Sequence, residues 1–232
     1  MSDRTVRRPA HRQVLRILSA LDRPFLMAAQ CFFAGGTRIV LELGEYRESK
    51  DVDFLCASRD GYRLLRDAVS GVSLGRVLGK EITLAREVRA DQYGIRTFVE
   101  GDGIKLKFEI IREARIDLEC ETVAAIPVPC LARRHCFAEK FLANADRGTD
   151  ASTLSRDIID LAFMMEGWSE GDARAGVAIA VGAYGDSVRR SLETAIRKMR
   201  EDRAYRKRCI EGLAITDAKL LTAGLRALSA LK

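Results

Sequence analysis

Short apolar runs separated by breaks fill the first part of the chain. The apolar run at residues 31–34 predicts a buried strand, which two glycines at residues 35 and 36 end. Residues 37–44 predict a short helix, and residues 52–55 predict the next strand, in which alternate side chains face a core. We therefore expect the order strand, glycine turn, helix, polar loop and strand.

Residues 79–111 follow a period of two, which is typical of strands with one buried face. Ile95, Thr97 and Val99 are expected to share a face. After a hairpin turn at residues 101–103, a second strand turns its apolar residues inward. Its outward face carries Lys105, Lys107 and Glu109.

Helical spacing of apolar residues dominates after the extended segment at residues 126–129. Helices are expected at residues 131–145, 154–166, 172–181, 187–208 and 216–231, in addition to one near the N-terminus at residues 11–21. We predict an N-terminal helix within residues 1–24, a core in residues 25–112 and a helical domain in residues 113–232. The predicted fold class is α+β: a mixed β-sheet flanked by helices, followed by a C-terminal helical domain.

Composition narrows the class of protein. Hydrophobic residues make up 47% and charged residues 31%, which is typical of a globular rather than a disordered chain. The net charge of +6 suits a polyanionic partner but is also ordinary for soluble proteins. The N-terminus lacks the apolar core of a signal peptide, and no apolar run reaches the roughly 18 residues that span a bilayer. We expect a cytoplasmic protein with no membrane partner.

Three acidic residues carry the candidate chemistry. Asp51 and Asp53 stand at i and i+2 and so point to one side of a strand, and Glu109 lies on the polar face of a later strand. Carboxylates about 4 Å apart repel by roughly 4 kcal/mol at an effective dielectric of 20, and a divalent cation relieves this repulsion. Upstream, Gly35-Gly36 permits close approach of a ligand, and Thr37 offers a hydroxyl to phosphate. We therefore hypothesise a phosphate-handling enzyme that uses Mg²⁺ or Mn²⁺.

These residues resemble the signature of the DNA polymerase β-like nucleotidyltransferase superfamily, in which a glycine turn precedes an Asp-x-Asp strand. The run Arg47–Phe54 is more narrowly similar to the AbiEii/AbiGii-type toxins of abortive-infection and toxin–antitoxin systems. Two later motifs also match that family: the lysine-containing helix with Glu139-Lys140 and Asp146-Arg147, and the Asp-x-x-Asp-Leu motif in residues 156–161.

The resemblance implies a role for each matched residue of the core. Residues Gly35, Gly36 and Thr37 would bind the triphosphate of a nucleotide. Asp51 and Asp53 would hold Mg²⁺. Glu109 would be the third carboxylate, which in this superfamily often acts on the attacking hydroxyl.

In the helical half, Lys140 would contact the triphosphate, and Asp157 would support Lys140 or the nucleotide. Asp160 would serve as a helix cap or an ion-pair partner. Arg47, in the loop before Asp51, is open to two interpretations: a phosphate contact or surface charge. The basic residues at 187–208 are open to two as well, an RNA-binding face with Tyr205 stacking on a base, or an ordinary charged surface.

Together these features predict an enzyme that moves a nucleoside monophosphate from an NTP to a hydroxyl and releases pyrophosphate. The resemblance implies RNA as acceptor, with the 3′ end of tRNA foremost, and a cognate antitoxin. Three alternatives stay open: a small-molecule acceptor such as an aminoglycoside, a protein acceptor, and a non-catalytic nucleotide-binding module.

Overall fold

The computed structural model describes residues 6–80, 82–101 and 103–231, and it divides into two compact units. The sheet unit comprises the chain up to Glu45 together with Ser49–Ala132. The helical unit comprises Arg133 to the C-terminus together with the three residues Tyr46–Glu48. Within the described residues, no helix is long and apolar enough to cross a membrane.

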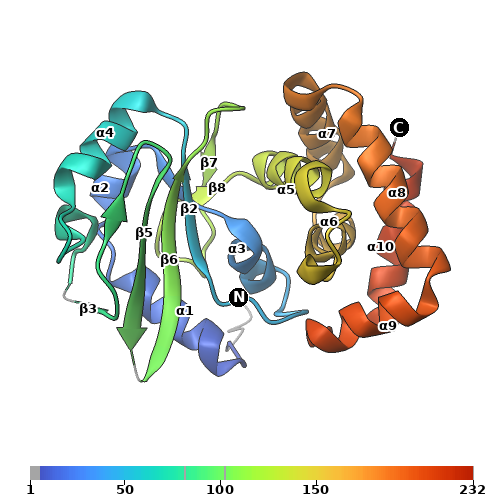
Figure 1. The fold of residues 1–232 in the computed structure, drawn as a ribbon, viewed down its shortest axis with the longest axis horizontal. Helices are drawn as coiled ribbons and strands as arrows, with labels where there is room; N and C mark the ends of the chain where they lie inside the picture. The colour runs from blue at the N-terminus through green and yellow to red at the C-terminus, as the bar shows by residue number, and fades with distance from the viewer. Residues whose placement is uncertain (1–5, 81, 102, 232) are drawn as a thin grey trace. The chain divides into compact units, whose positions relative to one another are not determined.

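The sheet unit is built on a mixed β-sheet (Figure 1). Among the described residues its strands run in the order β3-β5-β6-β2-β1-β8-β7, with β4 also paired to β5. β2 pairs with β6 and β1 with β8 in parallel, and the other pairs are antiparallel. The strands are β1 (Cys31–Phe33), β2 (Val52–Cys56), β3 (Thr83–Leu84), β4 (Arg89–Ala90), β5 (Gly94–Gly101), β6 (Ile104–Arg112), β7 (Cys120–Glu121) and β8 (Cys130–Leu131).

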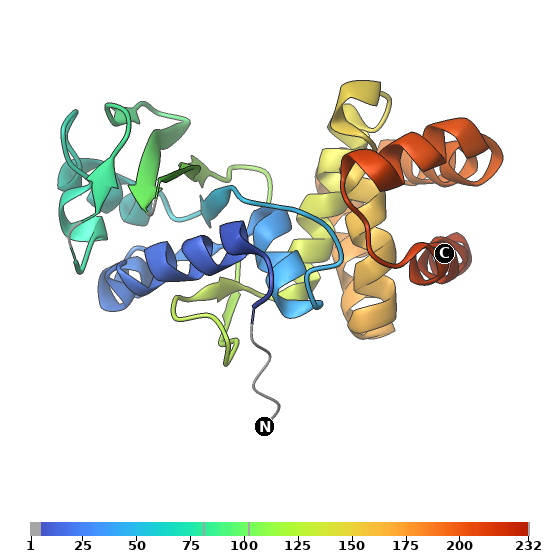
Figure 2. The ribbon, with the colours of Figure 1, turned by 90° about the horizontal axis from the view of Figure 1, so that it is seen from below.

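Helices cover the apolar face of this sheet. They are α1 (Pro9–Ser19), α2 (Arg23–Ala28), α4 (Arg59–Ala68) and the short 3-10 helix η1 (Gly75–Val77). Val14, Phe25 and Leu65 from the helices share one core with Phe54 and Phe108 from the strands. Figure 2 shows α1 on one side of the sheet, running across the direction of the strands. The opposite face of β2, β6 and β5 is therefore left to the charged residues that alternate with the apolar ones.

Burial confirms the predicted alternation in the two long strands. Ile95, Thr97 and Val99 are buried on β5, as are Leu106 and Phe108 on β6. The residues between them are half-buried or exposed. β5 and β6 form the expected hairpin, although Asp102 in the predicted turn lies outside the described residues.

The helical unit consists of α5 (Arg133–Arg147), the 3-10 helix η2 (Ala151–Thr153), α6 (Arg156–Gly167), α7 (Glu170–Tyr184), α8 (Ser187–Glu201), α9 (Arg203–Gly212) and α10 (Ala218–Ala230). α5 packs against α6, α7 and α8, and α10 packs against α6 and α8. The predicted helix at residues 187–208 is in fact two helices, because Asp202 ends α8 and its side chain caps α9 by accepting from the Tyr205 N–H.

The division into units differs from the predicted domains in three places. The N-terminal helix is part of the sheet unit, because its apolar side buries Val14 and Leu18 in the common core. The boundary falls after Ala132 rather than residue 112, because β7 and β8 extend the sheet. Two-residue strands are too short to show a period, so the sequence pattern did not reveal them. The third difference, the membership of Tyr46–Glu48, concerns the site described next.

Candidate active site

Asp53 and Glu109 are direct partners on neighbouring parallel strands. The register of β2 and β6 pairs Asp53 with Glu109, between the buried pairs Val52–Phe108 and Phe54–Ile110. Because partners across a sheet share a face and adjacent strands lie about 4.8 Å apart, the two carboxylates project together from the polar face. Asp51 stands two residues before Asp53, just ahead of β2. The structure thus brings a carboxylate of the Asp-x-Asp motif beside the third predicted carboxylate.

Gly35 begins helix α3 (Gly35–Glu42) directly against Asp53. Its φ of +70° lies in the left-handed region, and a Cβ placed there would come within 2.5 Å of Asp53 Oδ2. The preceding Ala34 N–H donates to the carbonyl of Asp53 at 2.8 Å, which fixes the start of α3 to β2. The glycine turn and the acidic strand therefore form one site, in which the first turn of α3, whose N–H groups have no partner within the helix, begins beside Asp53.

Glu109 already has two cationic partners. Arg96, its cross-strand partner on β5, places Nε 3.3 Å from Glu109 Oε1, and Lys107 places Nζ 2.5 Å from Oε2. In the described part of the chain, no three His, Cys, Asp or Glu side chains are arranged to hold a metal ion together. A ligand role for Glu109 therefore stays a prediction.

The two carboxylates of the Asp-x-Asp motif suit a divalent cation in kind. Mg²⁺ is usually bound through one or two protein carboxylates, with substrate phosphates and water filling its other positions. Asp51 and Asp53 provide oxygen donors of that kind, and Asp53 lies beside the start of α3. The donor set therefore fits Mg²⁺ without a third protein ligand.

The loop between α3 and β2 is held by a hydrogen-bond network. Thr37, fully buried, shares a 2.9 Å hydrogen bond with the Ser49 hydroxyl. His11 accepts from the Ser49 N–H through Nε2 at 3.2 Å, and its Nδ1 lies 2.8 Å from Glu45 Oε1. Since Nε2 is the acceptor, Nδ1 carries the proton and donates to Glu45. His11 is thus buried, and it holds the loop that leads to Asp51.

Glu45 stabilises this arrangement from an unusual backbone conformation. Its φ is +60°, a region that non-glycine residues seldom occupy. The N–H groups of Arg7 and Arg8 donate to its carboxylate at 2.7 and 3.0 Å. Burial alone would raise the pKa of this carboxyl, but the two backbone N–H groups and His11 outweigh it and lower the pKa. Sequence patterns gave no signal for this network, because the contacts of His11 join residues 34 and 38 positions apart and that of Thr37 joins residues 12 positions apart.

Lys140 and Asp157, predicted to act together, do meet in the helical unit. Lys140 Nζ lies 2.9 Å from Asp157 Oδ1 and 2.7 Å from Asp160 Oδ2. Arg147 also donates to Asp157, from Nε at 2.7 Å. Burial would raise the pKa of the Asp157 carboxyl, but Lys140 and Arg147 outweigh it and hold the pKa well below its usual range. All of these groups except Arg147 are buried, so Lys140 is a fixed ammonium with its orientation set by two carboxylates.

Arg47 completes this cluster and was misread from the sequence. The Arg47 side chain is buried and is not a surface charge. It binds Asp160 through two parallel hydrogen bonds of 2.6 and 2.7 Å, so its guanidinium is directed into the helical unit. Tyr46 donates to Asp160 Oδ1 at 2.6 Å and stacks on Phe163 with ring centroids 3.9 Å apart. These contacts explain why Tyr46–Glu48 belong to the helical unit although α3 and β2 on either side belong to the sheet unit.

The C-terminal helices do not provide the predicted stacking residue. Tyr205 is buried, shares a 2.8 Å hydrogen bond with the Ser155 hydroxyl, and is covered by Lys198 and Arg208 at 4.0 and 5.0 Å from its ring centroid. Lys198 and Arg208 therefore make cation–π contacts with the Tyr205 ring. An RNA-binding role for the rest of α8 stays a prediction.

Comparisons with known proteins identify the family of this chain. A family model described as nucleotidyl transferase AbiEii toxin, type IV TA system, matches residues 16–219. A protein from H. pylori assigned as a nucleotidyltransferase is similar in structure, with 17% identity, coverage of 100% of this chain and 94% of that chain, and a TM-score of 0.55. JHP933 from Helicobacter pylori is similar with 14% identity, coverage of 98% and 91%, and a TM-score of 0.54. No protein with a curated description matches. Because the family model spans most of the chain and includes the glycine turn, the acidic strand and the Lys140 and Asp157 motifs, the protein belongs to the AbiEii family of nucleotidyltransferase toxins.

Proposed function

We propose that this toxin is a metal-dependent nucleotidyltransferase that moves a nucleoside monophosphate from an NTP to a hydroxyl of RNA, foremost the 3′ end of tRNA. The observation that carries the proposal is the placement of Asp53 opposite Glu109 with Gly35 against the Asp53 carboxylate. A glycine turn, a helix start and paired carboxylates at one point combine an anion-binding element with cation-binding groups.

The reaction balances with these groups. The acceptor hydroxyl passes its proton to Glu109, its oxygen bonds to the α-phosphorus of the NTP, and the bond from that phosphorus to the β-phosphate oxygen breaks. Pyrophosphate leaves with the electron pair of that bond, and Glu109 then releases the proton to solvent. Glu109 is the carboxylate that we assign to this proton transfer, and the ion pairs with Arg96 and Lys107 hold its two oxygens. We assign the N–H groups at the start of α3 to the phosphate oxygens, because a helix N-terminus favours anions. Mg²⁺ or Mn²⁺, held by Asp51 and Asp53, would supply electrostatic stabilisation of the phosphates.

In the helical unit, Lys140 is the residue that we assign to the triphosphate, in line with the family's lysine-containing helix. The contacts that support this role are those of Asp157 and Asp160, which bind Lys140 Nζ and fix its position. A group that binds a transferring phosphate gains from such pre-organisation, because it need not reorient during the reaction.

The decisive experiment compares the wild type with Asp53→Asn and with Asp60→Asn as a matched control. Asp60 is on α4, with its side chain 85% exposed, so its substitution removes the same charge without touching the site. Each purified protein is incubated with Mg²⁺, one α-labelled NTP at a time, and total tRNA. We expect label in tRNA with the wild type and Asp60→Asn, and at least about a 100-fold loss with Asp53→Asn.

Other outcomes would change the proposal in defined ways. Label that enters a protein or a small-molecule acceptor but not tRNA would replace RNA as the acceptor. No incorporation with any NTP and any acceptor would refute the enzymatic proposal. Equal incorporation by Asp53→Asn would place the active site elsewhere.

The family's name also leads us to propose a cognate antitoxin and action in the cytoplasm, where the RNA acceptor is found. Expression of the wild type without its antitoxin should arrest growth of a bacterial host, whereas Asp53→Asn should not. Arrest by Asp53→Asn at an equal protein level would separate toxicity from nucleotidyl transfer.

A further inference from the structure

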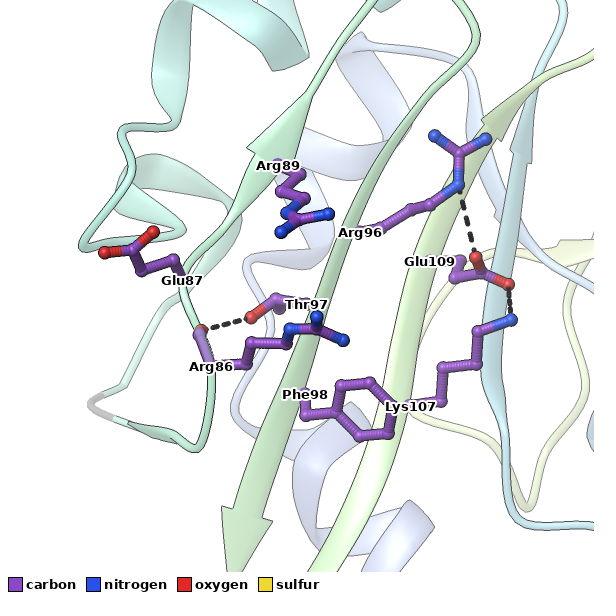
Figure 3. Close-up of a pocket in the computed structure, with 8 residues that line it drawn as sticks. All are labelled: Arg86, Glu87, Arg89, Arg96, Thr97, Phe98, Lys107 and Glu109. Atoms are coloured by element: carbon purple, nitrogen blue, oxygen red, sulfur yellow. Dashed lines mark hydrogen bonds and ion pairs between the residues drawn. The ribbon is translucent and has the colours of Figure 1, made fainter.

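A hollow of about 150 Å³ lies on the polar face of the sheet, next to Glu109. Its residues come from β4, β5, β6 and the segment before β4 (Figure 3). The hollow arises from an irregular edge. Leu84 pairs with Val99 and Arg89 pairs with Arg96, so the four residues between Leu84 and Arg89 stand opposite only two on β5. The two surplus residues form a bulge between β3 and β4.

Two hydrogen bonds fix this bulge, which carries Arg86 over β5. Ala85 N–H donates to the Phe98 carbonyl at 2.7 Å, and the Thr97 hydroxyl donates to the Arg86 carbonyl at 2.6 Å. The Arg86 guanidinium consequently stands 6.0 Å from the centroid of the Phe98 ring. Figure 3 shows Arg86 and Phe98 on the side of the hollow away from Arg89, with Lys107 leading from there toward Glu109.

The hollow carries an excess of positive charge. Arg86, Arg89, Arg96 and Lys107 line it, against the two carboxylates Glu87 and Glu109. Arg89 and Arg96 are direct cross-strand partners, an arrangement of like charges that destabilises a sheet. Arg96 is offset by Asp91 and Glu109, at 3.4 and 3.3 Å. Arg89 makes no ion pair within the described part of the chain. Such a pair of facing guanidiniums is favourable when an anion binds between them.

The basic hollow continues the row of acidic residues across the sheet. Successive strand registers align Asp53 on β2, Glu109 on β6, Arg96 on β5 and Arg89 on β4. Three strand spacings of about 4.8 Å make this row roughly 14 Å long. Gly35, where the nucleotide's phosphates are expected, lies at the Asp53 end, and the arginines lie at the other end, beyond Glu109.

We propose that this hollow binds the phosphodiester backbone of the acceptor nucleic acid, with Arg86 and Arg89 contacting phosphates and the half-buried Phe98 stacking on a base. This inference rests on the proposed function for the identity of the acceptor. A strand held there reaches Glu109 with its terminal hydroxyl, while the NTP occupies the Gly35 end. Arg–phosphate contacts and aromatic stacking together are the usual chemistry of single-stranded nucleic-acid binding.

The test measures binding without catalysis. A fluorescein-labelled single-stranded RNA of about 12 nucleotides, within the usual site size, is titrated with full-length protein in EDTA and without NTP, and anisotropy is followed at several KCl concentrations. The variants are Arg86→Gln/Arg89→Gln and Phe98→Leu. The matched control, Arg59→Gln/Arg66→Gln, removes two exposed arginines from α4. Circular dichroism melts confirm that all variants fold.

We expect the Arg86→Gln/Arg89→Gln variant to bind the RNA at least about tenfold more weakly than the α4 control. For single strands, each phosphate contact contributes about 0.7 to the magnitude of the slope of log K against log [KCl]. Loss of two such contacts should therefore reduce the magnitude of this slope by about 1.4. Phe98→Leu should weaken binding with the slope unchanged. Affinity for an NTP, measured by thermal shift with Mg²⁺, should be unaffected in all of them.

Equal RNA affinity in the hollow variant and the α4 control would overturn the proposal, because net charge alone would then explain binding. Weaker NTP binding with RNA binding retained would also overturn it and assign the hollow to the nucleotide. Failure of the proposed function has a different result. If the wild type binds the RNA through these arginines but transfers no label, the transfer reaction is refuted and the binding proposal stands.

Discussion

The substitution Gly35→Ala tests whether the glycine turn and the acidic strand form a single site. At φ +70°, alanine pays the cost of left-handed backbone, about 1–2 kcal/mol. Its Cβ would also lie 2.5 Å from Asp53 Oδ2. Ordinary van der Waals contact is roughly 1 Å longer, so the carboxylate must move by about that distance. A misplacement of about 1 Å at a reacting centre costs roughly 100-fold in rate.

Gly103→Ala separates these two effects. Gly103 has φ +74°, and a Cβ there meets nothing within 4 Å. Both variants should lose the same 1–2 kcal/mol, a fall in melting temperature of roughly 2–8 °C for a chain of this size. In the labelled-NTP assay, kcat/KM should fall about 100-fold only for Gly35→Ala. Equal activity of the two variants, at equal folded fraction, would refute the idea that Gly35 sets the position of Asp53.

Three further predictions concern buried polar groups. Asp160→Asn should lower the free energy of unfolding in urea by about 3–5 kcal/mol, because Arg47 and Lys140 stay buried with less compensating charge; a loss below about 1 kcal/mol would contradict this. Burial would raise the pKa of Asp160 and of Asp157, but their cationic partners outweigh burial and lower both pKa values. The two ionised carboxylates should therefore stabilise the wild type fully above the unfolded pKa of about 3.9. The free energy of unfolding should fall as the pH decreases below that value. In a calorimetric pH series, stability should fall less steeply with decreasing pH for Asp160→Asn than for the wild type. Equal pH dependence of the two proteins would argue against a stabilising role of these ion pairs. His11→Ala should lower the free energy of unfolding by about 1–3 kcal/mol in the same urea titration and reduce transfer activity, since Glu45 and the Ser49 N–H each lose a partner. His11→Gln keeps a donor and an acceptor and should recover part of the stability and part of the activity. Equal stability and activity of the two variants would argue against a structural role of the His11 hydrogen bonds.

Local patterns in the sequence predicted the strands β1, β2, β5 and β6, the glycine turn and the face on which the charged residues lie. Period-two alternation placed Glu109 outward on β6, and the i, i+2 spacing of Asp51 and Asp53 did the same for the acidic motif, because these features depend only on local backbone geometry. The helical spacing of the second half was equally local. The family resemblance added the link between Lys140 and Asp157, which the contact of 2.9 Å now gives a physical basis.

Contacts between residues far apart in the chain depend on the tertiary structure. The pairing of Asp53 with Glu109, the ion pairs of Glu109 with Arg96 and Lys107, and the Arg89–Arg96 pair all follow from strand order and register. Arg47 could not be assigned from its neighbours, because its burial depends on Asp160, 113 positions away. From sequence alone, a charged side chain is expected at the surface. It can lie in the interior only where an oppositely charged partner offsets the cost of its desolvation, and that partner is known only from the fold.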